Sequence, residues 1–257
     1  MNDVLSNVNI KKCYFDDVKS FVVEYYKNNQ IIADSFLEGH IRESNFYKIM
    51  YNDNIIGYFA INKETVLVLF NVFEKYRNIS QELFTLIKKY ESIKEALIPT
   101  GDEFFISHAV DNYVKIEKQA YFSIYTDKTP SKIINIELTL ADIEKDGEIL
   151  NICYDFLKGE IENIKKSADE EIYIARHENK IIGFGVIEYQ KIMDQYASIG
   201  MIVREEYRQK GYGANILNGL KNIVKGKGLT AISGCWYYNH NSKKQWKVQE
   251  HIQRPGY

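Results

Sequence analysis

The sequence predicts an α/β chain built as two tandem modules, each a central mixed β-sheet flanked by helices. Short β-branched runs alternate with helix-like runs along all 257 residues. Residues 53–59, a polar turn and a strand containing glycine, recur 126 residues later as residues 179–185. In the same order, Tyr76-Arg77 recurs as Tyr207-Arg208. The shared order indicates a duplication, and the alternative is two unrelated α/β segments of similar composition.

The boundary between the modules is expected at the polar turn of residues 126–131. The turn contains Pro130, the only proline between Pro99 and Pro255, and it separates two apolar, strand-like runs. We therefore expect a first domain over residues 1–130 and a second over residues 131–257.

The elements of each domain follow from periodicity, capping residues and turn residues. In the first domain we expect a helix at 15–27, strands at 46–51, 55–61 and 66–72, a helix at 80–91 and a strand at 121–125. In the second we expect a strand at 133–138, a helix at 143–157, strands at 171–176, 181–190 and 196–203, a helix at 212–225 and a strand at 230–238.

Composition excludes several classes of protein. A net charge of −2 and a pI near 6.3 argue against a nucleic-acid binder or a protein that binds an anionic membrane. Cys13, Cys153 and Cys235 are widely spaced, and without a C-x-x-C pair or a His-rich cluster we expect no disulfide framework and no metal site. The N-terminus lacks a signal-peptide pattern, and no apolar run approaches the ~20 residues of a membrane helix. We therefore expect a cytoplasmic protein.

The most informative motif is Arg-Gln-Lys-Gly-Tyr-Gly-Ala at residues 208–214, between a predicted strand and a predicted helix. Glycines at the start of a helix let backbone N–H groups surround an anion. A P-loop would require Gly-Lys-Ser/Thr, and a dinucleotide fingerprint would require a third glycine where Ile216 stands. A tight turn before a helix is the structural alternative.

Arg-x-x-Gly-x-Gly after a strand resembles the acyl-CoA pyrophosphate loop of the GNAT superfamily of N-acetyltransferases. The resemblance implies acetyl-CoA as cosubstrate, with loop amides on the pyrophosphate and the preceding strand residues on the pantetheine amides. It also implies that Asn239, at the end of a strand, and Ser242 open a helix beside the pantetheine arm. The implied cofactor-binding residues are Ile202, Val203, Arg208, Gln209, Lys210, Gly211, Tyr212, Gly213, Ala214, Asn239 and Ser242.

The chain departs from the family pattern after Ser242. The family pattern has a Gly-Phe or Gly-Tyr eight residues after Ser242, but Glu250 stands there. Trp246 occupies the place of the tyrosine that usually acts as the general acid. The tail shows no strand pattern, so part of a helix and two strands are expected to be lost or replaced. A frameshift near Lys244 is a hypothesis that the gene sequence tests.

The first half lacks glycine where the second has its loop. Residues 77–82 read Arg-Asn-Ile-Ser-Gln-Glu, and Glu82 would repel a phosphate at the helix start. We therefore expect a degenerate copy that serves as scaffold or as a wall of the acceptor site.

For catalysis, Glu188 is the expected base, with Tyr189 and Tyr196 as alternatives that hold a proton-relaying water. The expected activity is direct transfer of an acetyl group from acetyl-CoA to a primary amine on a small molecule or peptide. An inactive acyl-CoA-binding module and a scaffold are the rival interpretations. A homodimer is compatible with the sequence, which does not specify the oligomeric state.

Overall fold

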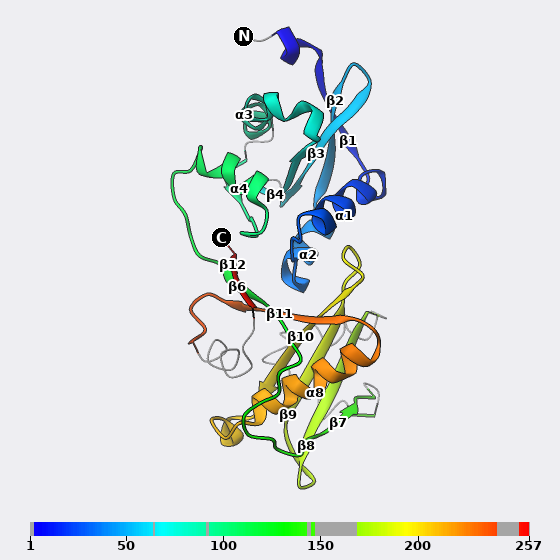
Figure 1. Ribbon diagram of the computed structural model, residues 1–257, viewed down its shortest axis with the longest axis vertical. Helices are drawn as coiled ribbons and strands as arrows, with labels where there is room; N and C mark the ends of the chain where they lie inside the picture. Colours follow the sequence, from blue (N-terminus) through cyan, green and yellow to red (C-terminus); the bar gives the residue numbers. More distant parts are fainter. Residues whose placement is uncertain are drawn as a thin grey trace. The chain divides into compact units, whose positions relative to one another are not determined.

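The computed structural model describes residues 3–63, 65–90, 93–142, 145–146, 169–240 and 252–256. The chain divides into two compact units, one of Met1–Ala120 with Arg254–Tyr257 and one of Tyr121–Gln253. Each contains a mixed sheet flanked by at least one helix (Figure 1). The predicted fold class is therefore confirmed.

The first unit has a five-stranded sheet in the order β1-β2-β3-β4-β5. All neighbouring pairs are antiparallel except β4 and β5, which run parallel. Helices α3 and α4 pack on Phe59 and Phe70 in the main core of this unit. The elements are β1 (Val8–Cys13), α1 (Lys19–Asn28), α2 (Ser35–Arg42), β2 (Asn45–Tyr51), β3 (Asn54–Asn62), β4 (Val66–Val72), α3 (Ser80–Tyr90), β5 (Glu95–Ala96) and α4 (Glu103–Val110).

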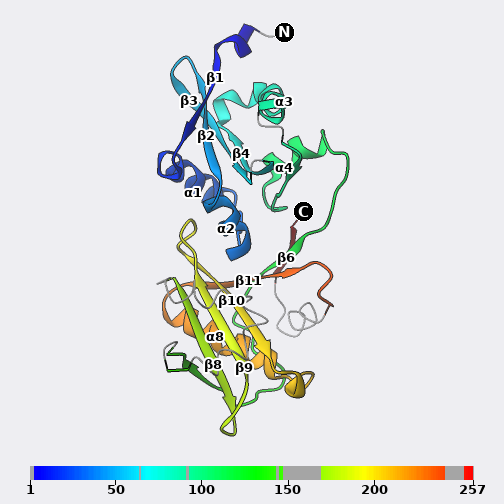
Figure 2. The same ribbon diagram turned by 180° about the vertical axis from the view of Figure 1, so that it is seen from behind.

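The second unit has a seven-stranded sheet in the order β12-β6-β11-β10-β9-β8-β7. Helix α8 lies across one face of β8, β9 and β10 (Figure 1), and from behind these strands lie in front of the helix (Figure 2). The elements are β6 (Ala120–Ile124), β7 (Glu137–Leu140), β8 (Glu170–His177), β9 (Lys180–Tyr189), β10 (Tyr196–Val203), α8 (Tyr212–Gly226), β11 (Thr230–Trp236) and β12 (Ile252–Gly256).

Three expectations about strands are wrong. The strand expected at 133–138 lies instead at Glu137–Leu140. The strand expected to complete the first module is β6, and it lies beside β11 in the second sheet, where the following Tyr125 N–H donates to Ala231 O at 2.9 Å. The tail, expected to hold no strand, contributes β12 beside β6. The predicted helix at 143–157 lies almost entirely outside the described residues.

The two units repeat one another in detail. The β2–β3 turn has positive φ at Asn52 and Asp53, and the β8–β9 turn has it at Glu178 and Asn179. The register of each pair shifts just before the turn, after Ile49 and after Ala175, again 126 residues apart. Gly57 and Gly183 also correspond, because a Cβ on either would lie within 2.4 Å of a carbonyl oxygen of the next strand. The first half is thus built on the same plan as the second.

Candidate functional site

Strands β10 and β11 of the second unit separate partway along their length. They pair in parallel only over Tyr196, Ala197 and Ser198, whereas β10 pairs with β9 through to Val203. Beyond Ser198, the edge of β10 that faces β11 has no paired strand among the residues the structure describes. Such an edge can accept an extended ligand as an added strand.

The motif loop joins the end of β10 to α8 and is held by its own contacts. Arg208 donates from Nε to Val203 O and from its backbone N–H to Glu205 O, both at 3.1 Å. Gln209 has a φ of 61° and Gly211 a φ of 91°, so the chain reverses through left-handed conformations before the helix starts. The Arg208 side chain thus fixes the loop, in addition to carrying positive charge.

Helix α8 begins without a capping side chain. Gly211 is its N-cap residue, no side chain accepts a hydrogen bond there, and the first turn holds no acidic residue. The first-turn amides of Tyr212 and Gly213 have no acceptor inside the helix, and the helix dipole favours negative charge at this end. The arrangement is suited to an anion such as a phosphate.

The two loop glycines serve different purposes. Gly211 is required by its left-handed φ, which side chains rarely adopt. A Cβ on Gly213 would instead lie 2.9 Å from Met201 Cε, so this glycine lets α8 approach β10 closely. Packing against Met201 accounts for the glycine at position 213, and a role for both glycines in making room for a phosphate stays a prediction.

A buried asparagine ties the loop to the segment before β7. Asn215 Oδ1 accepts from Ile134 N at 3.0 Å, and its Nδ2 donates to Lys132 O and Gly211 O, each at 3.0 Å. Asn215 was not predicted, because it stands among the polar positions of an amphipathic helix and belongs to no motif. The exposed Lys210 lies over the Tyr207 ring, with Nζ 5.6 Å from its centroid.

The equivalent helix start in the first unit is covered. A 3-10 helix, Glu74–Ile79, runs directly into α3, with no left-handed residue between them. Ser80 is buried, and its Oγ donates to Arg77 O at 2.8 Å and lies 2.8 Å from His108 Nε2 of α4. Glu82 adds a carboxylate in the first turn. The geometry that suits an anion at α8 is therefore absent from the described start of α3.

The two expected catalytic residues lie on opposite faces of the sheet. Tyr189 faces α8, beside the core that contains Ile187 and Ala197. Glu188 pairs across the strands with Ser198, on the other face. Both are partly exposed. The register therefore brings Glu188, and not Tyr189, to the face opposite α8.

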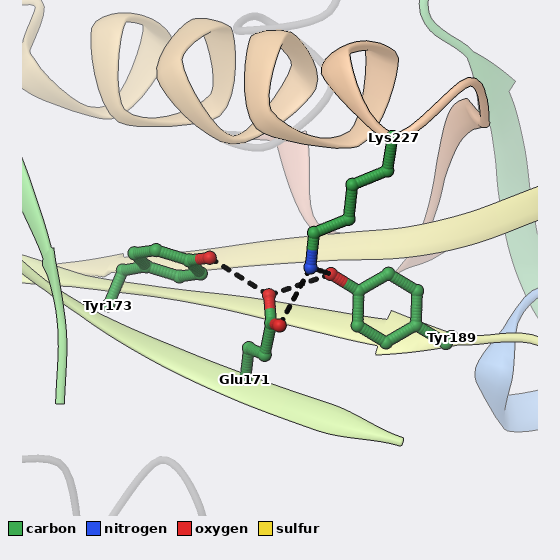
Figure 3. A network of polar contacts seen from close by, with 4 residues as sticks. All are labelled: Glu171, Tyr173, Tyr189 and Lys227. Atoms are coloured by element: carbon green, nitrogen blue, oxygen red, sulfur yellow. Dashed lines mark hydrogen bonds and ion pairs between the residues drawn. The ribbon is translucent and has the colours of Figure 1, made fainter. Parts of the chain in front are cut away.

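Tyr189 belongs to a polar network at the C-terminal end of α8 (Figure 3). Tyr173 and Tyr189 donate to Glu171 Oε2 at 2.8 and 2.7 Å, Lys227 Nζ lies 2.7 Å from Glu171 Oε1, and it also bonds the Tyr189 hydroxyl. Partial burial opposes ionisation of Glu171, but these donors outweigh it and lower the Glu171 pKa. Burial and the bond to Glu171 raise the Tyr173 pKa to about 12. The network fastens the end of α8 to β8 and β9.

Asn239 follows β11 in a turn, where its N–H donates to Trp236 O at 2.9 Å. Ser242, Trp246 and Glu250 lie outside the described residues. Within the described residues, no group of three or more His, Cys, Asp or Glu is placed to hold a metal, and no helix has the length and apolar character needed to span a bilayer.

Models of known protein families match both halves of the chain. A family model described as "Acetyltransferase (GNAT) family" matches residues 119–248, just over half of the chain, and one described as "Acetyltransferase (GNAT) domain" matches residues 14–126. The chain belongs to the GNAT acetyltransferase family. The two matches confirm the tandem arrangement of GNAT domains.

Solved GNAT structures share the fold of the whole chain. An acetyltransferase of the GNAT family from Colwellia psychrerythraea is 19% identical, with a TM-score of 0.82 over 96% of this chain and 98% of that one. A tandem GNAT protein of the clavulanic acid biosynthesis pathway is 12% identical, with a TM-score of 0.60 over 97% and 96%. Identities this low show the fold alone. No curated protein matches the chain.

Proposed function

We propose that this GNAT protein is a cytosolic N-acetyltransferase that moves an acetyl group from acetyl-CoA to a primary amine, and that the second unit binds the acetyl-CoA. The observation that carries the proposal is the uncapped, acid-free start of α8 at Gly211, next to the open edge of β10. A pyrophosphate at the helix start and a pantetheine arm along β10 would use both features together.

In this reaction an amine nitrogen attacks the thioester carbonyl carbon, the C–S bond breaks, and the sulfur takes a proton. The attacking ammonium must first lose a proton, which we assign to the Glu188 carboxylate. Glu188 is supported by its register opposite Ser198, the last residue before β10 and β11 separate. No covalent intermediate with the protein is needed.

The alternative, an acyl-CoA-binding module without catalysis, is favoured by Trp246, which has no hydroxyl to donate where the family usually has a tyrosine. If the chain is instead active, water is the acid that protonates the leaving sulfur. Turnover with any amine eliminates this alternative, and the absence of turnover despite binding supports it.

The cofactor assignment is tested by calorimetric titration of acetyl-CoA into the wild-type chain and the Lys210→Glu variant. Reversing the charge beside the loop removes one charged contact, so we expect the Kd to rise by about ten-fold, or about 1.4 kcal/mol.

Lys75→Glu is the matched control, since Lys75 Nζ lies over the Tyr76 ring at 5.5 Å much as Lys210 lies over Tyr207. It should leave the Kd unchanged. Equal weakening by both variants, or no binding by the wild type, would contradict the assignment.

A further inference from the structure

Strand β10 carries a glycine where a side chain would point away from α8. Ala197, Ile199 and Val203 pack in the core beneath α8, so the alternating residues Ser198 and Gly200 face the opposite side of the sheet. A Cβ placed on Gly200 would have no heavy atom within 4 Å. Gly200 therefore leaves room for a side chain on this face, although its cross-strand partner Val186 and the nearby Ser198 are buried.

The first unit has a leucine at the corresponding position. Gly200 pairs with Val186, and the equivalent pair in the first unit is Leu69 with Ala60. Leu69 is buried, with 2% of its surface exposed. The unit without the helix-start geometry thus places a large apolar side chain where the other unit leaves space.

Gly200 also lies at the position along β10 that the thioester of a bound acyl-CoA would reach. Gly200 is three residues from Val203, or about 10 Å along the strand. A pantetheine arm of about a dozen bonds has the reach of about four extended residues. An arm that starts at the α8 loop and follows β10 therefore brings its sulfur level with Gly200, just short of the point at Ser198 where β10 and β11 meet.

The direction of attack follows from the same geometry. An arm that pairs with the edge of β10 holds its carbonyl groups near the plane of the sheet, and an amine attacks a carbonyl roughly perpendicular to its plane. On the α8 side, Ile199 and Met201 pack against the helix and leave no path. The other side has the room that Gly200 leaves for want of a side chain, and it carries Glu188.

We propose that Gly200 determines acceptor size, by leaving a path over β10 for a primary amine borne on a bulky group such as a ring or a branched carbon. This inference rests on the proposed function, because it assumes that acyl-CoA follows β10. It assigns the space to the acceptor rather than to the acyl chain.

The test is calorimetric and needs no turnover. The probes are CoA, butyryl-CoA and two bisubstrate analogues in which the CoA sulfur is joined through an acetyl bridge to methylamine or to glucosamine. They are titrated into the wild type, Gly200→Val and Gly226→Val. Valine favours a strand, so Gly200→Val should fold. Gly226 is the control. A Cβ there also meets nothing within 4 Å, but Gly226 lies in the last turn of α8, away from the proposed acceptor path.

We expect Gly200→Val to bind CoA and the methylamine analogue within two-fold of the wild type and the glucosamine analogue at least ten-fold more weakly, with Gly226→Val unchanged throughout. Equal binding of both analogues by Gly200→Val would overturn the inference while leaving the proposed function intact. A selective loss of butyryl-CoA would also overturn it, because the space would then belong to the acyl chain. Failure of the wild type to bind CoA would overturn both.

Discussion

Two aspartates of the first unit are buried as helix N-caps. Asp102 Oδ1 accepts from Phe105 N at 3.0 Å and from the Tyr25 hydroxyl at 2.6 Å, and Asp34 accepts from Leu37 N at 3.0 Å. Burial raises the pKa of each carboxyl to about 6, although the hydrogen bonds work in the opposite direction. The fold therefore favours the protonated form of both groups more than the unfolded chain does.

This makes stability depend on pH in a defined direction. The contribution of Asp102 is fully present below about pH 4 and is lost as the pH rises through about 6, because its folded pKa exceeds its unfolded one. Asp102→Asn, neutral at every pH, should gain stability relative to the wild type between pH 4 and pH 7, by up to about 3 kcal/mol. Urea unfolding at the two pH values measures this.

Asp17 is the opposite case and serves as the control. A hydrogen bond from Tyr14 N and then one from Lys48 lower its pKa, so Asp17→Asn should lose stability relative to the wild type as the pH rises from below the pKa of Asp17 to neutrality. If Asp102→Asn differed from the wild type by the same amount at pH 4 and pH 7, its buried carboxyl would not be coupled to folding.

Tyr189 is expected to stabilise the fold without taking part in catalysis. Tyr189→Phe removes the hydrogen bonds to Glu171 and Lys227, which should lower the free energy of unfolding by about 1 kcal/mol. The acetyl-CoA Kd and the kcat of any measured acetyl transfer should stay within two-fold. A large fall in kcat with unchanged stability would return Tyr189 to the active site.

At the level of elements, the glycine N-cap of α8 is the feature most sensitive to substitution. Asn tolerates a left-handed conformation and Val does not. Gly211→Asn should therefore bind acetyl-CoA within about three-fold of the wild type, whereas Gly211→Val should bind at least ten-fold more weakly and lose about 1–2 kcal/mol of stability. Calorimetry and thermal unfolding of both variants measure this, and similar behaviour of the two would mean that φ at Gly211 does not shape the site.

Elements with strong local signals could be predicted from the sequence. The β-branched runs at Val66–Val72 and Tyr196–Val203 match the observed strands residue for residue. Weak signals were missed: half of the residues of β1 are polar, and β5 has only two residues. The position of β6 could not be predicted, because sheet membership depends on pairing with β11, over a hundred residues later.

The candidate site divides in the same way. The loop, α8 and the preceding strand follow from a contiguous motif, so the sequence alone locates them. Gly200 and Asn215 act through neighbours distant in the chain, and only the register and packing reveal them. The alternation of side chains along β9 does predict that Glu188 and Tyr189 face opposite sides.

At the level of the whole molecule, we expect one acetyl-CoA site per chain. The first unit places buried Ser80, the carboxylate Glu82 and buried Leu69 where the second unit has its glycine loop and Gly200. Calorimetry should give a stoichiometry of one, and Lys210→Glu should weaken that single site without exposing another. Two acetyl-CoA molecules per chain would contradict the degenerate first unit.

The position of β6 has a consequence for cleavage of the chain. The polar turn at residues 126–131 follows β6 in sequence, yet β6 lies between β11 and β12 in the second sheet. A protease that cut this turn would leave β6 on the N-terminal fragment while its hydrogen-bonding partners remained on the C-terminal one. The two fragments would stay associated through these strand pairs. Two polypeptides expressed separately, divided at this turn, would likewise assemble into one folded protein.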